Sequence, residues 1–348
     1  MKIAYIVPSL VNKGPVLVAQ MLTNLMTANG HECTVFYFDE KKELEFPCTA
    51  YRISLWQKID FAPYDIVHSH GLRPDIYVFL HKPRKGCTKF ISTLHNYIFE
   101  DLRLKYNKLT AFIFGNLWIG ILKRHDKICT LSKDAKQYYA RWLNPSKLTY
   151  AYNSIAITSL TALTREEEKI VSDFKDGYKL IGINASLIKR KGIDIIIKVL
   201  PDLPDCKLFV VGSGKEYKPL TRLAHQYQVS DRVLLIGYVK DAGRFLPYYD
   251  LYAMPSRSEG FGIALMEAAY MKIPIVCSDI DIFKELFSEI EVTFFSLSNQ
   301  RTLVDAVKTA LVQGKTLAAH ERFMNCYSPQ KMYDRYLSIY ASLNAPSI

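Results

Sequence analysis

The sequence predicts an α/β fold made of two doubly wound domains, and three observations support this prediction. Short apolar runs of strand length alternate with amphipathic segments of helical period along most of the chain. This alternation is typical of parallel sheets that carry helices on both faces. The same rhythm starts afresh after a polar stretch near residue 160. The 348 residues, 49% of them hydrophobic, are also enough to build two cores.

The first half contains four strand candidates and one well-bounded helix. The helix, "VLVAQMLTNLMTANG", ends at Gly30, which is a helix-stop signal. The strands are "KIAYIVP" (2–8), "HECTVFYF" (31–38), "YDIVHSHG" (64–71) and "KFISTLHN" (89–96). These elements predict an N-terminal domain over residues 1–160 and a polar, partly acidic linker, of loop or helix, over 161–177.

The second half repeats the pattern and predicts a C-terminal domain over residues 178–325. Its strands are "YKLIGINAS" (178–186), "CKLFVVGSG" (206–214), "RVLLIGYV" (232–239) and "DLYAMPS" (250–256). Helical segments follow them at 192–203, 216–229 and 242–249. Ligands of open α/β sheets bind at the carboxyl ends of the strands, so we expect the two domains to face a shared cleft that holds the site.

The net charge of +11 is concentrated in the first half of the chain. Residues 1–160 carry 21 Lys and Arg against 12 Asp and Glu, which is +9 of the total. A basic field on one domain suits an anionic partner such as a phosphorylated substrate, an anionic membrane or a nucleic acid. No nucleic-acid-binding module is recognisable in the sequence, so we expect no nucleic-acid partner.

The chain shows no signal peptide, and its longest apolar stretch, 109–122, is shorter than a bilayer-spanning helix. We therefore expect a cytoplasmic protein. The seven cysteines are scattered and form no C-x-x-C pair, which favours free thiols. No His, Cys or carboxylate cluster has metal-ligand spacing, so we expect neither a metal nor a resident cofactor.

The segment "SRSEGFGIALMEAAY" carries the clearest chemical signal. Glu259 lies on the loop after a strand, and Glu267 falls in the second turn of the helix that this loop opens. Gly260 and Gly262 let the backbone approach a ligand closely, and a helix N-terminus attracts phosphate. A carboxylate can accept hydrogen bonds from vicinal hydroxyls. The segment therefore predicts a site for a nucleotide that carries a sugar.

The same segment closely resembles the E-x7-E motif of family-four retaining glycosyltransferases, which have the GT-B fold. Other motifs follow in the order of that family. They are "HECTVF" after Gly30, "DIVHSHG" (65–71), "LHN" (94–96), "VVGSGKEYKPL" (210–220) and "LLIGYV" (234–239). The sequence departs from the family after the motif, where Lys272 or Ile273 replaces a glycine. The resemblance covers most of the chain and implies two Rossmann-like domains, with a C-terminal helix (326–348) that crosses back to the first.

The resemblance also implies a set of donor-binding and catalytic residues. His95 contacts the donor sugar near its reactive carbon and can donate to a hydroxyl or shuttle a proton. Glu259 holds donor-sugar hydroxyls or stabilises positive charge, and Glu267 holds the ribose. The implied donor-binding residues are Gly14, Ser186, Arg190, Lys191, Gly212, Tyr238, Val239, Gly260, Phe261, Gly262, Ile263 and Glu267.

One departure concerns the clamp for the donor diphosphate. The family pattern R-L-x-x-x-K-G reads Ser186-Leu-Ile-Lys-Arg-Lys191-Gly here, so a serine replaces the arginine. Lys191 matches the family lysine and is expected to bind the diphosphate. The sequence leaves open whether Arg190 or Lys189 supplies the missing charge.

By resemblance, the N-terminal domain binds the acceptor. Lys13, beside Gly14 in the loop after the first strand, and His70 are the candidate contacts. The basic and apolar segment 101–127 suits an anionic membrane surface, although for its apolar middle packing in the core is slightly favoured. We therefore expect peripheral association with the cytoplasmic leaflet of the inner membrane and a lipid-linked saccharide acceptor.

The resemblance implies transfer of a sugar, from a UDP-sugar by preference, in the synthesis of surface polysaccharides such as O-antigen, capsule or exopolysaccharide. Retention implies a same-face displacement with the leaving phosphate as base, and a covalent intermediate on Glu259 is the alternative mechanism. A nucleotide-sugar 2-epimerase of the same fold is the closest rival function. A glycan-binding protein that needs no nucleotide is a second rival. A nicotinamide-dependent enzyme is disfavoured because no G-x-G-x-x-G follows a strand.

Overall fold

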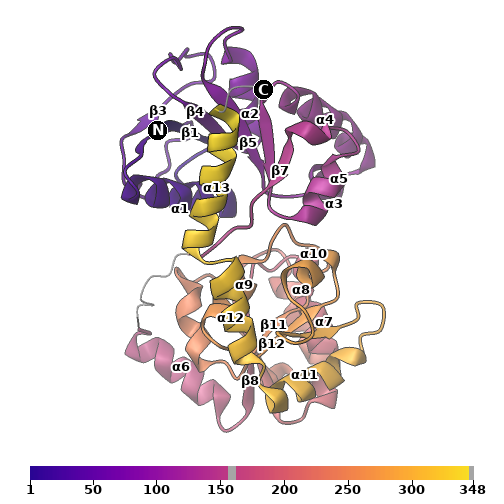
Figure 1. The fold of residues 1–348 in the computed structure, drawn as a ribbon. Helices are drawn as coiled ribbons and strands as arrows, with labels where there is room; N and C mark the ends of the chain where they lie inside the picture. Colours follow the sequence, from indigo (N-terminus) through magenta and orange to yellow (C-terminus); the bar gives the residue numbers. More distant parts are fainter. Residues whose placement is uncertain (156–161, 345–348) are drawn as a thin grey trace. The chain divides into compact units, whose positions relative to one another are not determined.

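The computed structural model describes residues 1–155 and 162–344, and the chain divides into two compact units (Figure 1). One unit comprises residues 1–156 together with 328–348, and the other comprises residues 157–327. Each unit is a parallel sheet with helices packed against it. The predicted α/β class with two Rossmann-like domains is therefore confirmed.

The N-terminal unit is built on seven parallel strands in the order β3-β2-β1-β4-β5-β6-β7. The strands are β1 (Lys2–Val7), β2 (Glu32–Tyr37), β3 (Ala50–Arg52), β4 (Ile66–His70), β5 (Lys89–Leu94), β6 (Lys127–Thr130) and β7 (Leu148–Tyr150). The order reverses its direction between β1 and β4. This reversal is the topological switch point at which open α/β sheets bind ligands.

The side chains of β1 alternate between two apolar clusters, one on each face of the sheet. Ile3, Tyr5 and Val7 pack in a cluster with residues of α1 and α13. Ala4 and Ile6 pack on the other face, in a cluster with residues of α2. The helices of this unit are α1 (Gly14–Ala28), α2 (Leu72–His81), α3 (Ile98–Lys105), α4 (Lys108–Leu122), α5 (Lys133–Tyr139) and α13 (Pro329–Asn344).

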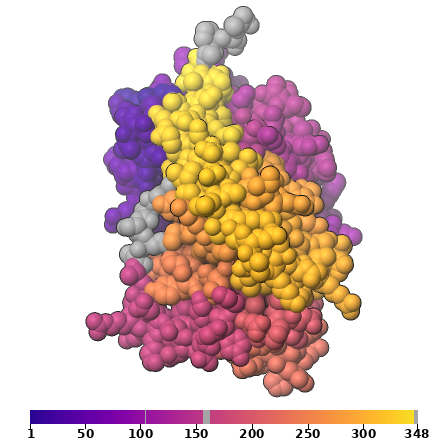
Figure 2. Space-filling view, turned by 60° about the horizontal axis from the view of Figure 1, so that its bottom comes forward, coloured from indigo at the N-terminus to yellow at the C-terminus, as the bar shows by residue number. Residues whose placement is uncertain are grey.

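The C-terminal helix α13 packs on the N-terminal unit, as predicted. Its yellow ribbon lies beside the indigo α1 in Figure 1, and the yellow surface borders the indigo surface in Figure 2. Buried polar contacts fix it, because the Tyr340 hydroxyl lies 2.7 Å from Nδ1 of His68 and 3.3 Å from the hydroxyl of Tyr5. Residues 345–348 of the predicted segment lie outside the described residues.

The C-terminal unit contains six parallel strands in the order β10-β9-β8-β11-β12-β13. The strands are β8 (Lys179–Asn184), β9 (Cys206–Val211), β10 (Val233–Leu235), β11 (Leu251–Met254), β12 (Ile275–Ser278) and β13 (Thr293–Phe295). The helices are α6 (Arg165–Lys175), α7 (Ile193–Val199), α8 (Tyr217–Gln226), α9 (Ile263–Tyr270), α10 (Asp281–Leu286), α11 (Thr302–Gln313) and α12 (Thr316–Cys326). The strand order matches that of the first unit, and the switch point lies between β8 and β11.

The structure corrects the predicted linker over 161–177. Residues 165–175 form α6, which begins with a capping box between Thr164 and Glu167. This helix belongs to the C-terminal unit, to which an ion pair of Glu167 with Arg244 ties it. The acidic residues that suggested a linker are the first turn of a helix, where carboxylates are favoured. The predicted domain boundary at residue 160 lies outside the described residues.

The apolar segment 109–122 forms most of α4, and within residues 1–155 and 162–344 no helix is long and apolar enough to cross a bilayer. All seven cysteines are free thiols, as predicted. The family glycine is replaced at Lys272, which adopts a φ of 57° and so keeps the left-handed turn that a glycine would make.

Candidate active site

A cluster of three charged side chains lies at the switch point of the C-terminal unit. Lys191 follows β8 and Glu259 follows β11, so neighbouring strands bring them together. Oε1 of Glu259 accepts hydrogen bonds from Nζ of Lys191 at 2.5 Å and from the hydroxyl of Ser256 at 2.7 Å. Oε2 accepts from the Arg190 guanidinium at 3.1 Å. The predicted site residues Arg190, Lys191 and Glu259 are therefore in direct contact.

The cluster keeps one positive charge in excess. Burial raises the pKa of Glu259, but Lys191 and Arg190 outweigh this effect and hold the pKa below its usual value. Glu259 is thus ionised and buried, whereas the two cations are partly exposed. Two cations that share one buried carboxylate can still attract an anion at their exposed side.

Arg257 braces the two loops that form the cluster, and sequence reasoning missed it. Its guanidinium makes a bidentate ion pair with Asp194, at 2.8 and 2.7 Å, and also donates to the carbonyl of Lys189. Its backbone N–H donates to the carbonyl of Arg190 at 2.8 Å. The residue types that bind each other are visible in the sequence. Their separation of 63 residues meant that only the fold could pair them.

Glycines let the loops at this edge pack backbone against backbone. A Cβ at Gly192 would lie 1.9 Å from the carbonyl oxygen of Pro255, and one at Gly212 would lie 1.9 Å from that of Ala185. Gly262 adopts a φ of 94° at the start of α9. A larger residue at Gly192 would push the loop of Lys191 away from the loop after β11 that carries Glu259.

Glu267 lies on α9, one strand away from the cations, and its carboxylate has no hydrogen-bond partner among the described residues. It is half-buried, and burial raises its pKa to about 7. The first N–H groups of α9 lack partners within the helix, and no side chain caps them. Phe261 is buried beneath this turn, and Ile263 is half-buried in it. The turn thus combines free N–H donors with an acceptor eight residues after Glu259.

The remaining predicted donor residues lie on the same edge but make fewer contacts. Ser186 is exposed, follows β8, and its hydroxyl has no partner in the described part of the chain. Tyr238 and Val239 follow β10, and the tyrosine is mostly exposed. The structure places Arg190, not Lys189, beside Lys191, because the side chain of Lys189 is exposed and unpaired among residues 1–155 and 162–344.

The N-terminal unit brings its predicted residues to the equivalent edge of its own sheet. Lys13 and Gly14 open α1 after β1, while His70 ends β4 and His95 follows β5. Nδ1 of His70 lies 3.0 Å from Nε2 of His95. His70 is fully buried, so the prediction that it contacts the acceptor does not match its position behind His95.

Burial favours the neutral form of both histidines of this pair. Burial lowers the pKa of His95 to about 3 and that of His70 well below its usual value. An imidazole with such a pKa cannot act as a proton donor in its charged form near neutral pH. The neutral form favours hydrogen bonding by this pair, and a proton shuttle at His95 stays a prediction.

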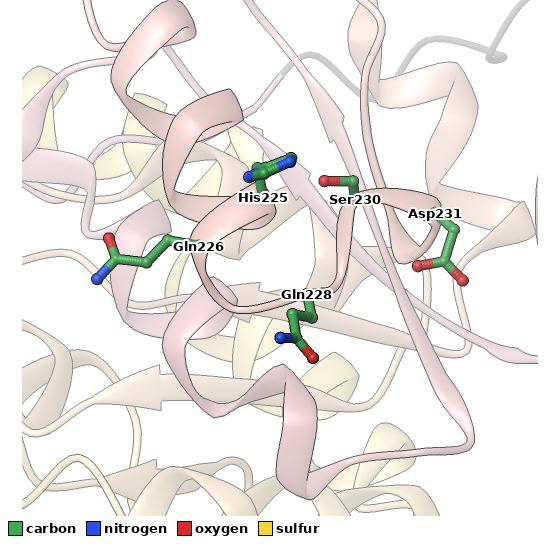
Figure 3. Close-up of a pocket in the computed structure, with 5 residues that line it drawn as sticks. All are labelled: His225, Gln226, Gln228, Ser230 and Asp231. Atoms are coloured by element: carbon green, nitrogen blue, oxygen red, sulfur yellow. The ribbon is translucent and has the colours of Figure 1, made fainter.

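A hollow of about 530 Å³ lies at the end of α8, lined by His225, Gln226, Gln228, Ser230 and Asp231 (Figure 3). It precedes β10 and so lies at the amino edge of the sheet, opposite the charged cluster. Within residues 1–155 and 162–344, no group of His, Cys, Asp and Glu has the arrangement of a metal site.

Two family models match the chain, one on each unit. The model described as "Glycosyltransferase Family 4" matches residues 13–158, and "Glycosyl transferases group 1" matches residues 164–322. The O-antigen biosynthesis glycosyltransferase WclY of Escherichia coli is 34% identical over 353 residues, with 99% of each chain covered. A second Escherichia coli relative is 24% identical over 66% of this chain and 61% of its own length. It is the UDP-Gal:alpha-D-GlcNAc-diphosphoundecaprenol alpha-1,3-galactosyltransferase.

Solved structures share the fold at low sequence identity. The Anabaena protein Alr3699/HepE, in complex with UDP and glucose, superposes with a TM-score of 0.81 at 15% identity. The match covers 98% of this chain and 100% of the other. Sucrose-phosphate synthase from Thermosynechococcus elongatus gives a TM-score of 0.79 at 16% identity, with 99% and 100% covered. These matches support the GT-B architecture of the chain.

Proposed function

The chain belongs to the family-four glycosyltransferases, and we propose that it is a retaining, metal-independent enzyme acting on a nucleoside diphosphate sugar. The donor is a UDP-sugar, and the acceptor is a hydroxyl of a lipid-linked saccharide in O-antigen or related surface polysaccharide synthesis. The named activities of the two Escherichia coli relatives support this donor and acceptor class. The observation that carries the proposal is the Arg190–Lys191–Glu259 cluster at the switch point.

The cluster supplies what a departing diphosphate requires. As the bond between the anomeric carbon and the diphosphate breaks, negative charge gathers on the phosphate oxygens. Preorganised cations aimed at that charge lower the barrier. Lys191 and Arg190 are held in place by Glu259 before any ligand arrives, so little reorganisation is needed. Arg190 takes over the role of the arginine that Ser186 replaces.

The hydrogen bonds of Glu259 favour a same-face displacement over a covalent intermediate. A nucleophilic carboxylate needs an oxygen lone pair directed at the anomeric carbon. Lys191 and Ser256 bind one oxygen of Glu259 and Arg190 binds the other, and the two cations make the carboxylate a weaker nucleophile. In the mechanism that we propose, the acceptor oxygen bonds to the anomeric carbon on the face that the diphosphate leaves. The acceptor proton passes to a phosphate oxygen.

Glu267 and the start of α9 bind the rest of the donor. The carboxylate of Glu267, which has no partner among the described residues, accepts hydrogen bonds from the two ribose hydroxyls in its ionised form. Burial raises its pKa to about 7, so this form becomes the main one above neutral pH. The free N–H groups at Gly262 and Ile263 face a diphosphate oxygen. The donor thus extends from the cations after β8 to the carboxylate on α9.

The acceptor side of the proposal includes a membrane surface that α4 contacts. One side of α4 packs in the unit through Ala111, Gly115 and Ile119. The opposite side exposes large apolar side chains to more than half of their area: Leu109, Phe112, Ile113, Phe114 and Leu117. Exposed basic residues stand at both ends of the helix: Lys105, Lys108, Lys123 and Arg124. An apolar face flanked by cations fits the headgroup region of an anionic bilayer.

The membrane contact is tested by sedimentation of the protein with vesicles of zwitterionic lipid, with and without an anionic lipid. We expect the protein to bind only vesicles that contain the anionic lipid, and salt to weaken this binding. The double variant Phe112→Asp with Leu117→Asp should lose it. Val312→Asp, at an exposed apolar residue of the C-terminal unit, serves as the control. Binding that is the same with and without the anionic lipid would contradict the proposal.

The enzymatic proposal is tested with a panel of nucleotide sugars, first by thermal shift and then by transfer to lipid-linked saccharides. We expect a UDP-sugar to stabilise the protein and the product to keep the anomeric configuration of the donor. Conversion of the donor sugar to its 2-epimer in the absence of any acceptor would instead identify a nucleotide-sugar 2-epimerase. If no nucleotide sugar stabilises the protein, the proposal is wrong.

A further inference from the structure

His70 and His95 of the N-terminal unit share a hydrogen bond, and one buried ring nitrogen of this pair has no partner among the described residues. Nδ1 of His70 and Nε2 of His95 are 3.0 Å apart, and the ring centroids are 5.2 Å apart with a 32° angle between the planes. Nε2 of His70 is buried and has no partner among the described residues. Nδ1 of His95 also has none there, but His95 is only half-buried. The pair therefore has one closed end and one end that a ligand can reach.

The neutral state of both rings restricts how they can be joined. Each neutral imidazole carries one hydrogen, on either Nδ1 or Nε2. If His95 donates through Nε2, the hydrogen of His70 lies on its buried Nε2, where it has no acceptor. If His70 donates through Nδ1, its Nε2 is a bare lone pair, and the hydrogen of His95 lies on Nδ1.

The second arrangement fits the burial better. In protein interiors, buried N–H groups without an acceptor are rarer than buried acceptors without a donor. A buried N–H that loses its water and gains no acceptor costs free energy. The neighbouring His68 shows the usual solution in the same cluster. Its two nitrogens lie 2.7 Å from the hydroxyls of Tyr340 and Thr93, so both are satisfied. His70 has no such hydroxyl at Nε2, and a bare nitrogen is the lesser cost there.

We propose that His70 is a positioning residue that holds His95 in the tautomer with its hydrogen on Nδ1. His95 then offers a neutral N–H donor to a hydroxyl of a bound saccharide, at the edge where β4 and β5 end. This role rests on the proposed function, since the saccharide is the ligand of that function. The hydrogen bond from His70 also fixes the direction of the His95 ring. No proton is transferred, and His95 acts as a donor throughout.

The tautomer is measured directly by long-range ¹H–¹⁵N correlation NMR on the full chain labelled at histidine. We expect His95 to show a protonated Nδ1 and a bare Nε2 in the free protein. His70→Asn should preserve this pattern, because an asparagine amide can occupy the position of the imidazole Nδ1 and donate from it. His70→Phe should shift the hydrogen of His95 towards Nε2. A hydrogen on Nε2 of His95 in the unaltered protein would overturn the proposal.

Kinetics supply the second readout. Loss of one oriented hydrogen bond should lower kcat/KM for transfer by about tenfold in His70→Phe, and His70→Asn should recover most of it. Tyr340→Phe is the matched control. It removes a buried hydroxyl from the adjacent His68, so it should lower the unfolding temperature while leaving the His95 tautomer and kcat/KM unchanged. An unchanged kcat/KM in His70→Phe with an altered tautomer would also overturn the proposal.

The two proposals fail in different ways. If the unaltered protein transfers sugar from no nucleotide sugar, the proposed function is wrong, whereas the NMR result still decides the tautomer. If transfer occurs and His95 is protonated on Nε2, only the role of His70 is wrong. Should His70→Phe not fold, His70→Asn and the spectrum of the unaltered protein still decide the question.

Discussion

The carboxyl edges of the two sheets share a strand order but carry different chemistry. At the switch point of the C-terminal unit, two cations meet a buried carboxylate, and a bidentate ion pair braces their loops. At the equivalent edge of the N-terminal unit, the central contact joins two neutral imidazoles. A charged cluster suits a diphosphate, and a pair of neutral histidines suits sugar hydroxyls. The two sheets thus share a topology and differ in the side chains that follow their strands, which is why we propose a different ligand group for each.

The largest expected effect tests the charged edge at its closest contact. Lys191→Ala should lower kcat by about 10²- to 10³-fold, because a preorganised cation is lost where charge develops. Steady-state transfer kinetics measure this effect. Lys189→Ala is the matched control, since that side chain is exposed on the same turn and should change kcat less than twofold. Equal losses of kcat in both variants would mean that catalysis depends on the total positive charge of this turn and not on the contact of Lys191 with Glu259.

Arg190 offers a second test of the charged edge. Arg190→Ala should lower kcat by about tenfold to a hundredfold, since a second cation of the clamp is lost. Ser186→Arg in that background should restore much of the activity, because it returns the arginine to the position that the family uses. Assays of the two variants side by side decide the point. If Ser186→Arg gives no recovery, Arg190 does not replace the family arginine.

Glu267 should make donor binding depend on pH. Its pKa is raised to about 7 by burial, so affinity for a UDP-sugar should rise between pH 6 and pH 8 as the acceptor ionises. Calorimetric titration at several pH values measures this. Glu267→Gln should bind about tenfold more weakly at pH 8 and lose most of the pH dependence. A flat profile in the unaltered protein would show that the carboxylate does not contact the donor.

The same residue gives a stability prediction of opposite sign. A carboxyl whose folded pKa is raised binds its proton more tightly in the folded state. Glu267 therefore lowers the free energy of unfolding as pH rises from about 4.5 to about 7. Glu267→Gln should be more stable than the unaltered protein at pH 8, by roughly 1–3 kcal/mol, and equally stable below pH 4.5. Thermal unfolding across pH tests this, and lower stability of the variant at pH 8 would contradict it.

The smallest effect concerns the brace behind the charged edge. Arg257→Lys keeps the charge but cannot make the bidentate pair with Asp194, so the loops should be held less precisely. We expect kcat/KM to fall by about threefold to tenfold while the unfolding temperature changes little. Lys198→Arg, on the exposed side of the same Asp194, is the control. An unchanged kcat/KM would mean that the Arg257–Asp194 ion pair contributes to stability and not to catalysis.

Much of the fold could be predicted from the sequence, because strand and helix periodicity is local. The periodicity located three strands correctly: β4, which ends at His70, β5, which precedes His95, and β8, which precedes Ser186. It also located the loop that carries Glu259. The linker was placed wrongly, because the acidic first turn of α6 looks like a polar connection until it packs. The resemblance carried most of the site. It could not show that Glu259 is bonded to Arg190 and Lys191, or that Arg257 reaches Asp194, because those pairs span more than 60 residues. The burial of His70, and hence its position behind His95, also depends on the packed sheet.

The central claim, that Arg190 and Lys191 bind a nucleoside diphosphate, is tested most directly by calorimetric titration of the full chain with UDP, UMP and uridine. We predict that UDP binds much more tightly than uridine, and that Lys191→Ala lowers the affinity for UDP by tenfold or more. Uridine, which lacks phosphate, should bind the variant and the unaltered protein equally. Binding of UDP that is unaffected by Lys191→Ala, or no stronger than that of uridine, would contradict the account.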